Sequence, residues 1–272
     1  MTNPAIAPET LEKEAALKKK LAEYGSIAIA YSGGVDSSYL ADVAHETLGH
    51  GAHILIADSP SIPRDELAGA MSLAQERGWH LRILHTQEFE KEDFLKNDGR
   101  RCYHCKDELF TRMAEYARGH QVRVLAHGEI ADDAEDPTRL GARAAREHAV
   151  AAPLAGVDLG KEEIRALSRR RKLPTWNKPS FACLSSRFPR GQRVAIGEML
   201  KVERAEQVLK RLGFHQYRAR HHGDTCRIEV EPRDFGRILD PAVREEIIAD
   251  LTRAGYRHIT LDLAGYRTGS TA

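Results

Sequence analysis

The residue types that bind phosphate occur together in one run, Ser32-Gly33-Gly34-Val35-Asp36-Ser37. A short apolar stretch at 27–31 precedes this run, and a helical pattern starts at Asp36. Two glycines permit a tight turn and a close approach to a ligand, and the first turn of a helix presents unpaired N–H groups. The serine hydroxyls add donors. No lysine stands beside the glycines as in a Walker loop, which argues against ordinary γ-phosphoryl transfer.

The four cysteines of this 272-residue chain suit metal binding or thiol chemistry better than a disulfide scaffold. Cys102 and Cys105 are three residues apart at the start of a helical pattern, and Cys183 lies in a proline-rich stretch. Three thiolates on a cubane iron–sulfur cluster would leave one iron open to an extra sulfur or a substrate atom. Cys226 alternates with apolar neighbours, so we expect it to be buried in a strand.

Other interpretations of these thiols stay open. His104 could complete a structural zinc site with the three thiolates, although ligands at 102, 104 and 105 strain a tetrahedron. A redox dithiol normally follows the first strand of its fold, and this pair does not. The three thiols could also be unrelated to one another.

The elements that must position these residues alternate between two patterns. Short β-like runs at 26–31, 53–57, 81–85 and 122–126 are separated by helical patterns at 36–48, 64–78 and 105–118, with further helices at 9–24 and 139–148. This alternation predicts an α/β fold, a parallel sheet with helices on both faces. Ligands bind such sheets beyond the carboxyl ends of the strands. Asp58 and Ser59 are therefore candidates for ribose or adenine contacts, or simple loop residues, and Gly128 is a candidate for close backbone approach.

The composition changes after the helical pattern at 161–172, whose basic end, 169–172, is expected to be solvated. We predict a nucleotide-binding domain at 1–172, a linker loop with Cys183 at 173–196, and a smaller α+β domain at 197–272. Within the last domain, the patterns predict helices at 197–212 and 241–254 and strands at 214–220, 225–231 and 257–263.

The charge balance and hydropathy exclude some partners. The chain has 41 basic and 40 acidic residues, which implies no global field that would hold nucleic acid, and we expect no stable nucleic-acid complex. No apolar run reaches the length of a membrane span, and the polar first ten residues lack a signal-peptide core. We therefore expect a cytoplasmic protein with no membrane partner.

Several strings read together resemble the LarE family, the ATP-dependent sulfur transferases of nickel-pincer nucleotide biosynthesis and lactate racemase maturation. This family belongs to the ATP pyrophosphatase, or PP-loop, superfamily. The similarity runs from about residue 9 to residue 269. Besides the loop, it rests on Arg-Cys-Tyr-His-Cys-Lys at 101–106, Trp-Asn-Lys-Pro at 176–179, Cys-Leu-Ser-Ser-Arg-Phe-Pro at 183–189 and Leu-Asp-Leu-Ala-Gly-Tyr-Arg at 261–267.

The resemblance implies an activity and its cofactors. ATP would adenylate a carboxylate of pyridinium-3,5-biscarboxylic acid mononucleotide, and sulfur would then displace AMP to give a thiocarboxylate. A [4Fe-4S] cluster held by Cys102, Cys105 and Cys183 would deliver the sulfur, whereas in other members a cysteine gives up its own sulfur, a role that would fall to Cys183. The implied assembly is a homo-oligomer such as a hexamer.

Three aspartates are candidates for binding Mg²⁺. A carboxylate suits this hard cation, and Asp36 is the predicted ligand on the pyrophosphate side. Asp132 or Asp136 could share that duty. At 132–141, the chain departs from the string Asp-Tyr-Arg-Pro-Gly that members of the family often have near this position.

The implied substrate offers carboxylates and a phosphate, both of which arginine binds in a bidentate manner. Arg187 follows Cys183 by four residues, and both are predicted to be catalytic. Surface salt bridges are the simpler explanation of each further arginine. Substrate contacts are predicted for Arg218 and Arg220 on one face of a strand, for Arg227 and Glu229 on the next strand, and for Arg267.

Three other functions compete with sulfur transfer to a small nucleotide. A tRNA-thiolating enzyme shares the loop, the adenylation and the cluster, but the near-zero net charge and the lack of an obvious basic, aromatic-rich module argue against it. An amide-forming synthetase would not need Cys102 and Cys105. A non-catalytic regulator would bind nucleotide and metal without releasing pyrophosphate.

Overall fold

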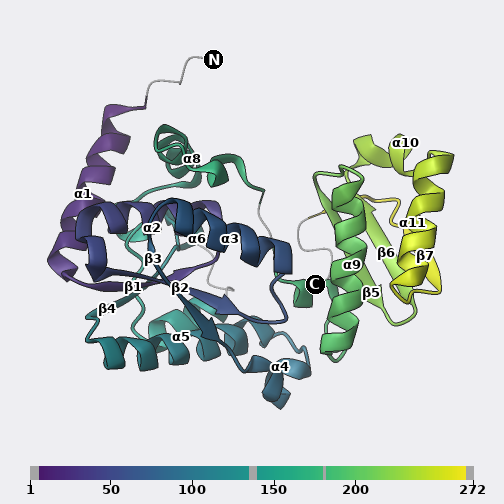
Figure 1. Cartoon of the computed structure of the whole chain (residues 1–272), viewed down its shortest axis with the longest axis horizontal. Helices are drawn as coiled ribbons and strands as arrows, with labels where there is room; N and C mark the ends of the chain where they lie inside the picture. The colour runs from purple at the N-terminus through teal and green to yellow at the C-terminus, as the bar shows by residue number, and fades with distance from the viewer. Residues whose placement is uncertain (1–5, 135–139, 180–181, 268–272) are drawn as a thin grey trace. The chain divides into compact units, whose positions relative to one another are not determined.

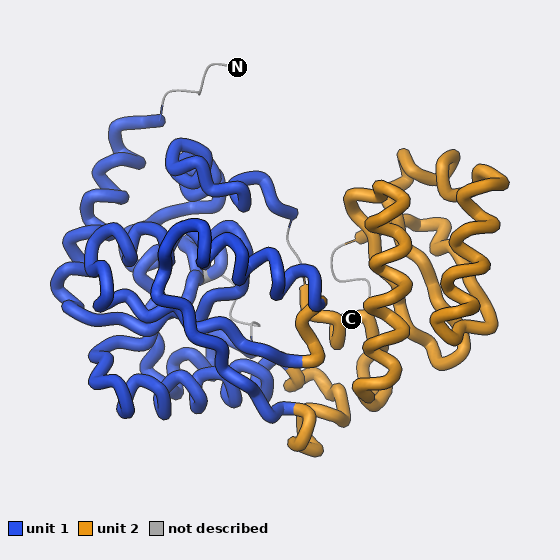
Figure 2. Tube along the Cα trace, viewed as in Figure 1, with its two compact units in different colours: residues 1–59, 64–88, 102–181 blue, residues 60–63, 89–101, 182–272 orange. Residues whose placement is uncertain are grey.

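The computed structural model describes residues 6–134, 140–179 and 182–267. The chain forms two compact units, coloured separately in Figure 2. Unit 1 contains residues 1–59, 64–88 and 102–181, and unit 2 contains 60–63, 89–101 and 182–272. Two short segments from the first half of the sequence therefore belong with the C-terminal unit. No helix of the described ranges is long and apolar enough to cross a membrane.

Unit 1 is built on a parallel sheet with the strand order β3-β2-β1-β4 in the described part of the chain (Figure 1). The strands are β1 Ile27–Tyr31, β2 Ala52–Asp58, β3 His80–His85 and β4 Val124–His127. Every residue of β1 is buried, because a central parallel strand is covered on both faces. The predicted α/β class is confirmed.

Helices cover both faces of this sheet (Figure 1). Helices α5 Arg101–His120 and α7 Leu140–Glu147 form one apolar layer with the strands, in which Phe110 and Met113 join Ala28 and Leu55. Helix α2 Val35–Leu48 packs against β1 and contacts both α1 Pro8–Tyr24 and α8 Lys161–Arg170. The remaining helices of unit 1 are α3 Arg64–Glu76 and the short α6 Ala131–Ala134.

Unit 2 is a smaller α+β unit, also as predicted. Its sheet has the order β5-β6-β7 in the described residues, with β5 and β6 antiparallel and β6 and β7 parallel. Apolar residues of α9, α11 and the three strands form its core. The elements are α4 Glu92–Leu95, α9 Ile196–Arg211, β5 Tyr217–His222, β6 Thr225–Val230, α10 Phe235–Ile238, α11 Pro241–Arg253 and β7 His258–Leu261.

Short 3₁₀ turns connect these elements. Two of them, η4 and η5, lie within the stretch 173–196 that the sequence predicts to be irregular. The turns are η1 Gly49–Gly51, η2 Glu88–Glu90, η3 Ala155–Val157, η4 Pro174–Asn177, η5 Leu184–Arg187 and η6 Pro232–Asp234.

The basic end of α8 corrects one expectation. Arg171 is not solvated, since its side chain is 15% exposed and it reaches carboxylates on α1 and α2. Its guanidinium donates to Glu14 at 3.0 Å, to Asp42 at 2.9 Å, and to Glu46. The sequence pattern could not distinguish this half-buried, ion-paired arginine from its exposed neighbour Lys172.

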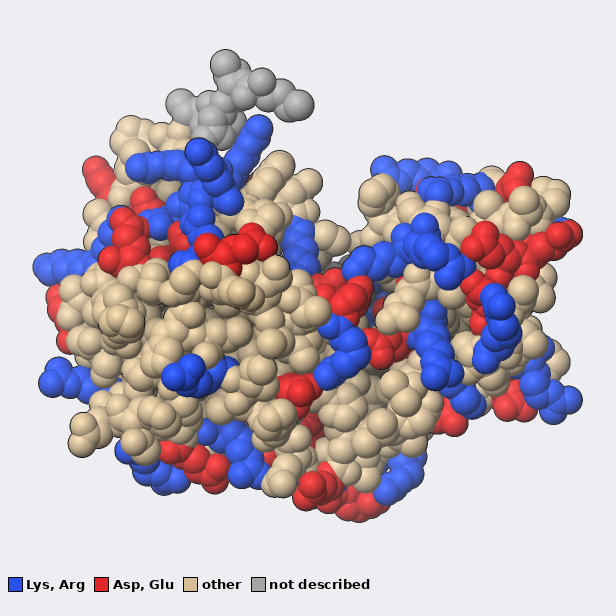
Figure 3. Space-filling view, in the orientation of Figure 1, with Lys and Arg blue, Asp and Glu red and all other residues tan. Residues whose placement is uncertain are grey.

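Charges of both signs are interspersed on the face of the molecule shown in Figure 3. This distribution agrees with the nearly equal numbers of basic and acidic residues in the sequence.

Candidate active site

The turn between β1 and α2 has the geometry of an anion-binding loop. Gly33 has a φ of +69°, in the left-handed region. Gly34 is the N-cap residue of α2 and offers no side chain to the N–H groups of the first turn. Those N–H groups and the positive end of the helix dipole are therefore directed to the loop, as phosphate binding requires.

Two serines close this loop on itself. The Ser37 hydroxyl accepts from the Ser32 backbone N–H at 3.2 Å and lies 3.0 Å from the Ser32 hydroxyl. Ser37 is buried, whereas Ser32 is exposed. The predicted donors are thus adjacent, and their contact with phosphate stays a prediction.

Asp36, the predicted Mg²⁺ ligand, forms an ion pair with a lysine that the sequence did not single out. The Nζ of Lys161 lies 2.9 and 2.8 Å from the two Asp36 carboxylate oxygens. Lys161 is the first residue of α8, and its backbone N–H donates to Asp132 at 2.7 Å. Lys161 therefore contacts both Asp36 and Asp132. Asp136 lies outside the described residues.

A second lysine contacts the other end of the loop. The Nζ of Lys178 donates to the Gly33 carbonyl at 2.9 Å and pairs with Glu66 at 2.6 Å. Lys178 belongs to the string Trp-Asn-Lys-Pro at 176–179, which the sequence analysis quoted without giving it a role.

The other predicted residues of unit 1 lie at or just after the carboxyl ends of strands. A Cβ on Gly128 would come within 3.0 Å of the Ser37 backbone nitrogen, so the glycine permits close packing against the start of α2. Asp58 ends β2 and pairs with Arg64 at 2.5 Å. Ser59 is buried and donates to Glu88. Ribose or adenine contacts of these residues stay a prediction.

A histidine whose side chain is 12% exposed lies at the carboxyl end of β4. Burial and, to a smaller degree, the charge of nearby Lys106 together lower the pKa of His127 to about 4. The ring is therefore neutral at pH 7, and its Nε2 lies 3.0 Å from Glu129.

Cys102 and Cys105 both lie in the first turn of α5, which begins four residues earlier than the predicted helix at 105–118. Residues three apart on a helix share a face. Cys183 is the N-cap residue of η5 in unit 2, and its sulfur lies 3.0 Å from the Ser185 hydroxyl. Joint ligation by the three thiols stays a prediction, and no group of three His, Cys, Asp or Glu within the described residues could hold a metal ion.

Cys226 is buried in β6, as expected. Burial raises the pKa of its thiol to about 12, and Glu206 adds to this effect. A thiol that resists ionisation in this way is a poor metal ligand.

A buried ion pair holds the Cys183 loop. Arg187 is 0% exposed, and its guanidinium donates to both Glu206 carboxylate oxygens at 2.7 and 2.8 Å. The same guanidinium donates to the carbonyls of Ala182 at 2.7 Å and Cys183 at 3.1 Å. These contacts make Arg187 a residue that shapes the loop, and its predicted catalytic role stays a prediction. The sequence analysis missed Glu206, which lies on α9.

Neighbouring segments of unit 2 also hold this loop. The backbone N–H of Leu184 donates to the Ser61 carbonyl at 2.8 Å. Arg101 donates to the Ser185 carbonyl at 2.7 Å, and Asn97 donates to the Pro189 carbonyl at 2.8 Å. These bonds explain why 60–63 and 89–101 belong to the C-terminal unit.

The predicted arginine face of unit 2 exists. Antiparallel pairing places Arg218 opposite Glu229 and Arg220 opposite Arg227, so all four side chains share one face. Arg220 binds Glu229 in a bidentate manner at 3.0 and 2.9 Å, and Arg227 donates to Glu229 at 3.1 Å.

Two further contacts involve the C-terminal string. Arg218 is buried, and its guanidinium lies 4.9 Å from the centre of the Tyr266 ring. Arg227 lies 3.6 Å from Asp262. Arg267 is exposed. Substrate contacts of all these residues stay a prediction.

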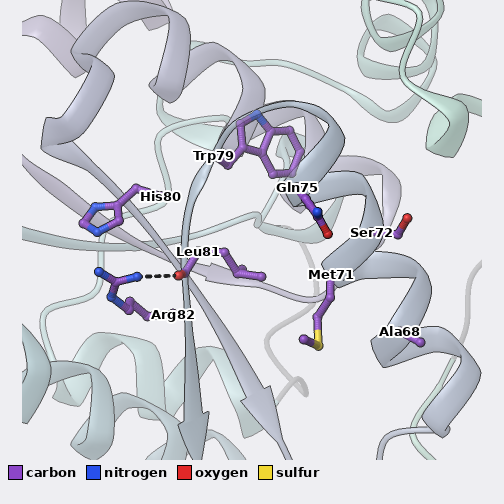
Figure 4. A pocket seen from close by; sticks show the side chains of 8 residues that line it. All are labelled: Ala68, Met71, Ser72, Gln75, Trp79, His80, Leu81 and Arg82. Carbon is purple, nitrogen blue, oxygen red and sulfur yellow. Dashed lines mark hydrogen bonds between the residues drawn. The ribbon is translucent and has the colours of Figure 1, made fainter.

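A pocket of about 580 Å³ lies elsewhere in unit 1, between α3 and the start of β3 (Figure 4). It is at the amino end of the strand, opposite to the edge where a parallel sheet binds ligands. None of the predicted site residues lines it. Its lining residues are Ala68, Met71, Ser72, Gln75, Trp79, His80, Leu81 and Arg82.

Comparison with known proteins identifies the family. No family model matches the chain. An uncharacterized protein of Synechocystis sp. is 36% identical over 93% of this chain and 94% of its own length. An uncharacterized protein of Methanocaldococcus jannaschii is 28% identical over 95% of the chain and 98% of its own length.

A third relative is named as an enzyme. The pyridinium-3,5-bisthiocarboxylic acid mononucleotide synthase of Lactiplantibacillus plantarum is 31% identical over 94% of this chain and 92% of its own length. Identity at this level along nearly the whole of both proteins agrees with the strings noted in the sequence. The chain therefore belongs to the LarE family.

Proposed function

We propose that this protein is an ATP-dependent sulfur transferase that converts a carboxylate of pyridinium-3,5-biscarboxylic acid mononucleotide into a thiocarboxylate. The observation that carries the proposal is the 31% identity to a synthase named for the corresponding bisthiocarboxylic acid product. The loop at 32–37 supports it, because its glycines and helix N-terminus suit the phosphates of ATP.

The proposed reaction has two steps. A carboxylate oxygen attacks the α-phosphorus of ATP, the bond to the bridging oxygen breaks, and pyrophosphate leaves. Sulfide then attacks the acyl carbon, the bond to the AMP oxygen breaks, and a thiocarboxylate, AMP and a proton result. The first step is needed because a carboxylate is a poor electrophile until its oxygen becomes part of a good leaving group.

The chain's own residues would stabilise the leaving pyrophosphate. Backbone N–H groups at the start of α2 are fixed in position before the reaction, and such preorganised donors are worth more than mobile water. Asp36 would hold Mg²⁺, whose charge offsets the charge that grows on the leaving group.

We further propose that Cys102, Cys105 and Cys183 hold a [4Fe-4S] cluster, which when bound would supply a transferable sulfide on the iron without a cysteine ligand. Two observations support this use of the thiols. Cys102 and Cys105 share one face of α5. Arg101, the residue before Cys102, belongs to the same unit as Cys183 and donates to Ser185, two residues beyond it.

Pyrophosphate release tests the proposed activity. We expect release that depends on the pyridinium biscarboxylate and is lost in Asp36→Asn. Release with tRNA or ammonia instead, or ATP binding without any release, would replace the proposal with one of the competing functions.

Anaerobic purification with iron and sulfide analysis tests the proposed source of sulfur. We expect a broad visible absorption that is lost in Cys102→Ala, Cys105→Ala and Cys183→Ala alike. A colourless protein that contains zinc would exclude the cluster. A loss of about one H₂S from the intact mass after turnover would make Cys183 the consumed donor.

A further inference from the structure

The nucleotide loop has no lysine of its own, although a polyanion must be neutralised there. In a Walker loop, a lysine next to the last glycine reaches the terminal phosphates. In this chain, the corresponding positions are Val35 and Asp36. Two lysines from much later in the sequence contact the loop instead, Lys161 at Asp36 and Lys178 at Gly33.

Helix α8 positions both lysines. Lys161 stands at its first residue, and the Glu163 carboxylate fixes that helix end by accepting from the Gly160 N–H at 2.9 Å. Lys178 follows η4, which is attached to the same helix by two contacts. Arg165 donates to Asn177 at 3.1 Å, and the guanidinium of Arg169 lies 5.0 Å from the centre of the Trp176 ring.

Each lysine is balanced by one carboxylate. Lys161 binds both oxygens of Asp36, and Lys178 binds Glu66. The side chains of the two lysines are 34% and 26% exposed, so the pairs are open to solvent and to exchange with another anion. The two ammonium groups and the two carboxylates together carry no net charge. A bound phosphate is therefore stabilised by one of these lysines only when that lysine leaves its carboxylate partner.

We propose that Lys161 and Lys178 together take the place of the Walker lysine, and that Asp36 holds Lys161 back until another cation occupies that carboxylate. The inference rests on the proposed function, since it concerns the site at which ATP would bind. Lys161 then moves from Asp36 to the phosphates. Lys178 remains beside Gly33 and contributes its charge at the other end of the turn.

Titration of inorganic pyrophosphate into the protein by calorimetry, in low salt with EDTA, tests this exchange. Asp36→Asn is expected to bind pyrophosphate about tenfold more tightly than the wild type, because it frees Lys161 for a charge-assisted hydrogen bond. The double variant Asp36→Asn with Lys161→Met should lose this gain. Lys178→Met should weaken pyrophosphate binding by a similar factor in the wild type and in Asp36→Asn.

Two sets of variants control for fold and for general charge. Lys19→Met removes one positive charge from an exposed position of α1 and should leave pyrophosphate binding unchanged. Lys161→Arg and Lys178→Arg keep the charge and should retain most of the binding. Thermal unfolding of every variant identifies any that fails to fold. If a methionine variant fails, pyrophosphate binding by the corresponding arginine variant is compared with that of the wild type.

Two results would overturn the proposal. In one, Asp36→Asn binds pyrophosphate no more tightly than the wild type. In the other, the double variant keeps the full gain, which would assign it to the lost negative charge alone. Failure of the proposed function is distinguishable, because pyrophosphate binding would follow the expected pattern while no pyridinium-dependent release occurred.

Discussion

Gly33 is the residue on which the shape of the loop at 32–37 depends most directly. Its φ of +69° is one that other residues rarely adopt. A Cβ at this position would also lie 2.7 Å from the Cβ of Ala70, which is 3% exposed on α3 and has little room to move. Backbone conformation and space therefore both require glycine.

Gly33→Ala is expected to destabilise the protein by about 1–3 kcal/mol and to weaken ATP binding, because the turn must distort to admit the methyl group. Urea unfolding and calorimetric titration measure the two effects. Gly69→Ala is the matched control, since its Cβ would meet nothing within 4 Å on α3. That change should stabilise by up to ~1 kcal/mol. Equal stability of the two variants would contradict the role given to Gly33.

The residues of the loop were predictable because they are local. Gly33, Gly34 and the serines are adjacent in sequence, and their types alone indicate a turn for phosphate. Lys161 and Lys178 were not predictable, because they lie 125 and 145 residues from their partners in the loop. In a sequence with 41 basic residues, nothing marks Lys161 before folding, and Lys178 is marked only as part of the string at 176–179, which does not reveal its contact with Gly33.

Helix α8 is fixed at its far end by a buried network of charges. Arg171 bridges Glu14 on α1 and Asp42 on α2, and Arg77 also donates to Asp42 at 2.9 and 2.8 Å. Asp42 is 7% exposed and Glu14 is 8% exposed. Buried carboxylates depend on such partners, because burial of an unpaired charge is costly.

Arg171→Met is expected to lower the free energy of unfolding by about 1–3 kcal/mol, because Glu14 loses its nearest cation while Asp42 keeps Arg77. Lys172→Met changes the exposed neighbour and should stay within about 0.5 kcal/mol of the wild type. Denaturant unfolding of both variants provides the comparison. An Arg171→Met protein as stable as Lys172→Met would show that the network contributes little.

The strand end at His127 gives the fold a dependence on pH. The pKa of His127 is about 4 in the folded protein and near 6.5 in the unfolded chain. As pH falls from 6.5 towards 4, the unfolded chain takes up a proton that the folded protein does not, so stability falls. Each unit of pKa difference corresponds to about 1.4 kcal/mol, which gives a loss of up to ~3 kcal/mol.

His127→Gln should reduce this acid sensitivity. We expect the stability difference between pH 7 and pH 4 to be smaller in the variant than in the wild type, by denaturant unfolding at each pH. Other histidines with lowered pKa values, such as His53 and His221, contribute equally to both proteins and cancel in the comparison. An unchanged pH profile would mean that His127 is protonated in the folded state as readily as in the unfolded chain.

The strands and helices were predictable from periodicity, and their boundaries less so. The parallel sheet was predictable because short apolar runs alternate with helical patterns, and the central run, β1, is buried throughout. The start of α5 was placed four residues late, at 105 instead of 101. The polar run before Cys102 has no helical periodicity, so the start of the helix was not evident. In the structure, Asp98 and Arg100 form a turn in which the Arg100 backbone N–H donates to the Asp98 carboxylate at 2.8 Å.

The molecule divides its chemistry between two units. Unit 1 contains the loop at 32–37, the two lysines that contact it and the pair Cys102 and Cys105, and unit 2 contains Cys183 and the arginine face. Sequence patterns could predict these groups separately, because each lies on one or two neighbouring elements. They could not predict that segments 60–63 and 89–101 fold with the C-terminal unit, because the bonds that hold them join distant residues.

The most direct test is the mass of the product after a single turnover. The protein would be incubated anaerobically with ATP, Mg²⁺ and pyridinium-3,5-biscarboxylic acid mononucleotide, and the products separated and weighed by mass spectrometry. We expect a nucleotide in which sulfur replaces one carboxylate oxygen, with AMP and pyrophosphate formed in equal amounts. AMP and pyrophosphate without sulfur in the product, or ADP and phosphate, would contradict the assignment of this chain as a sulfur transferase.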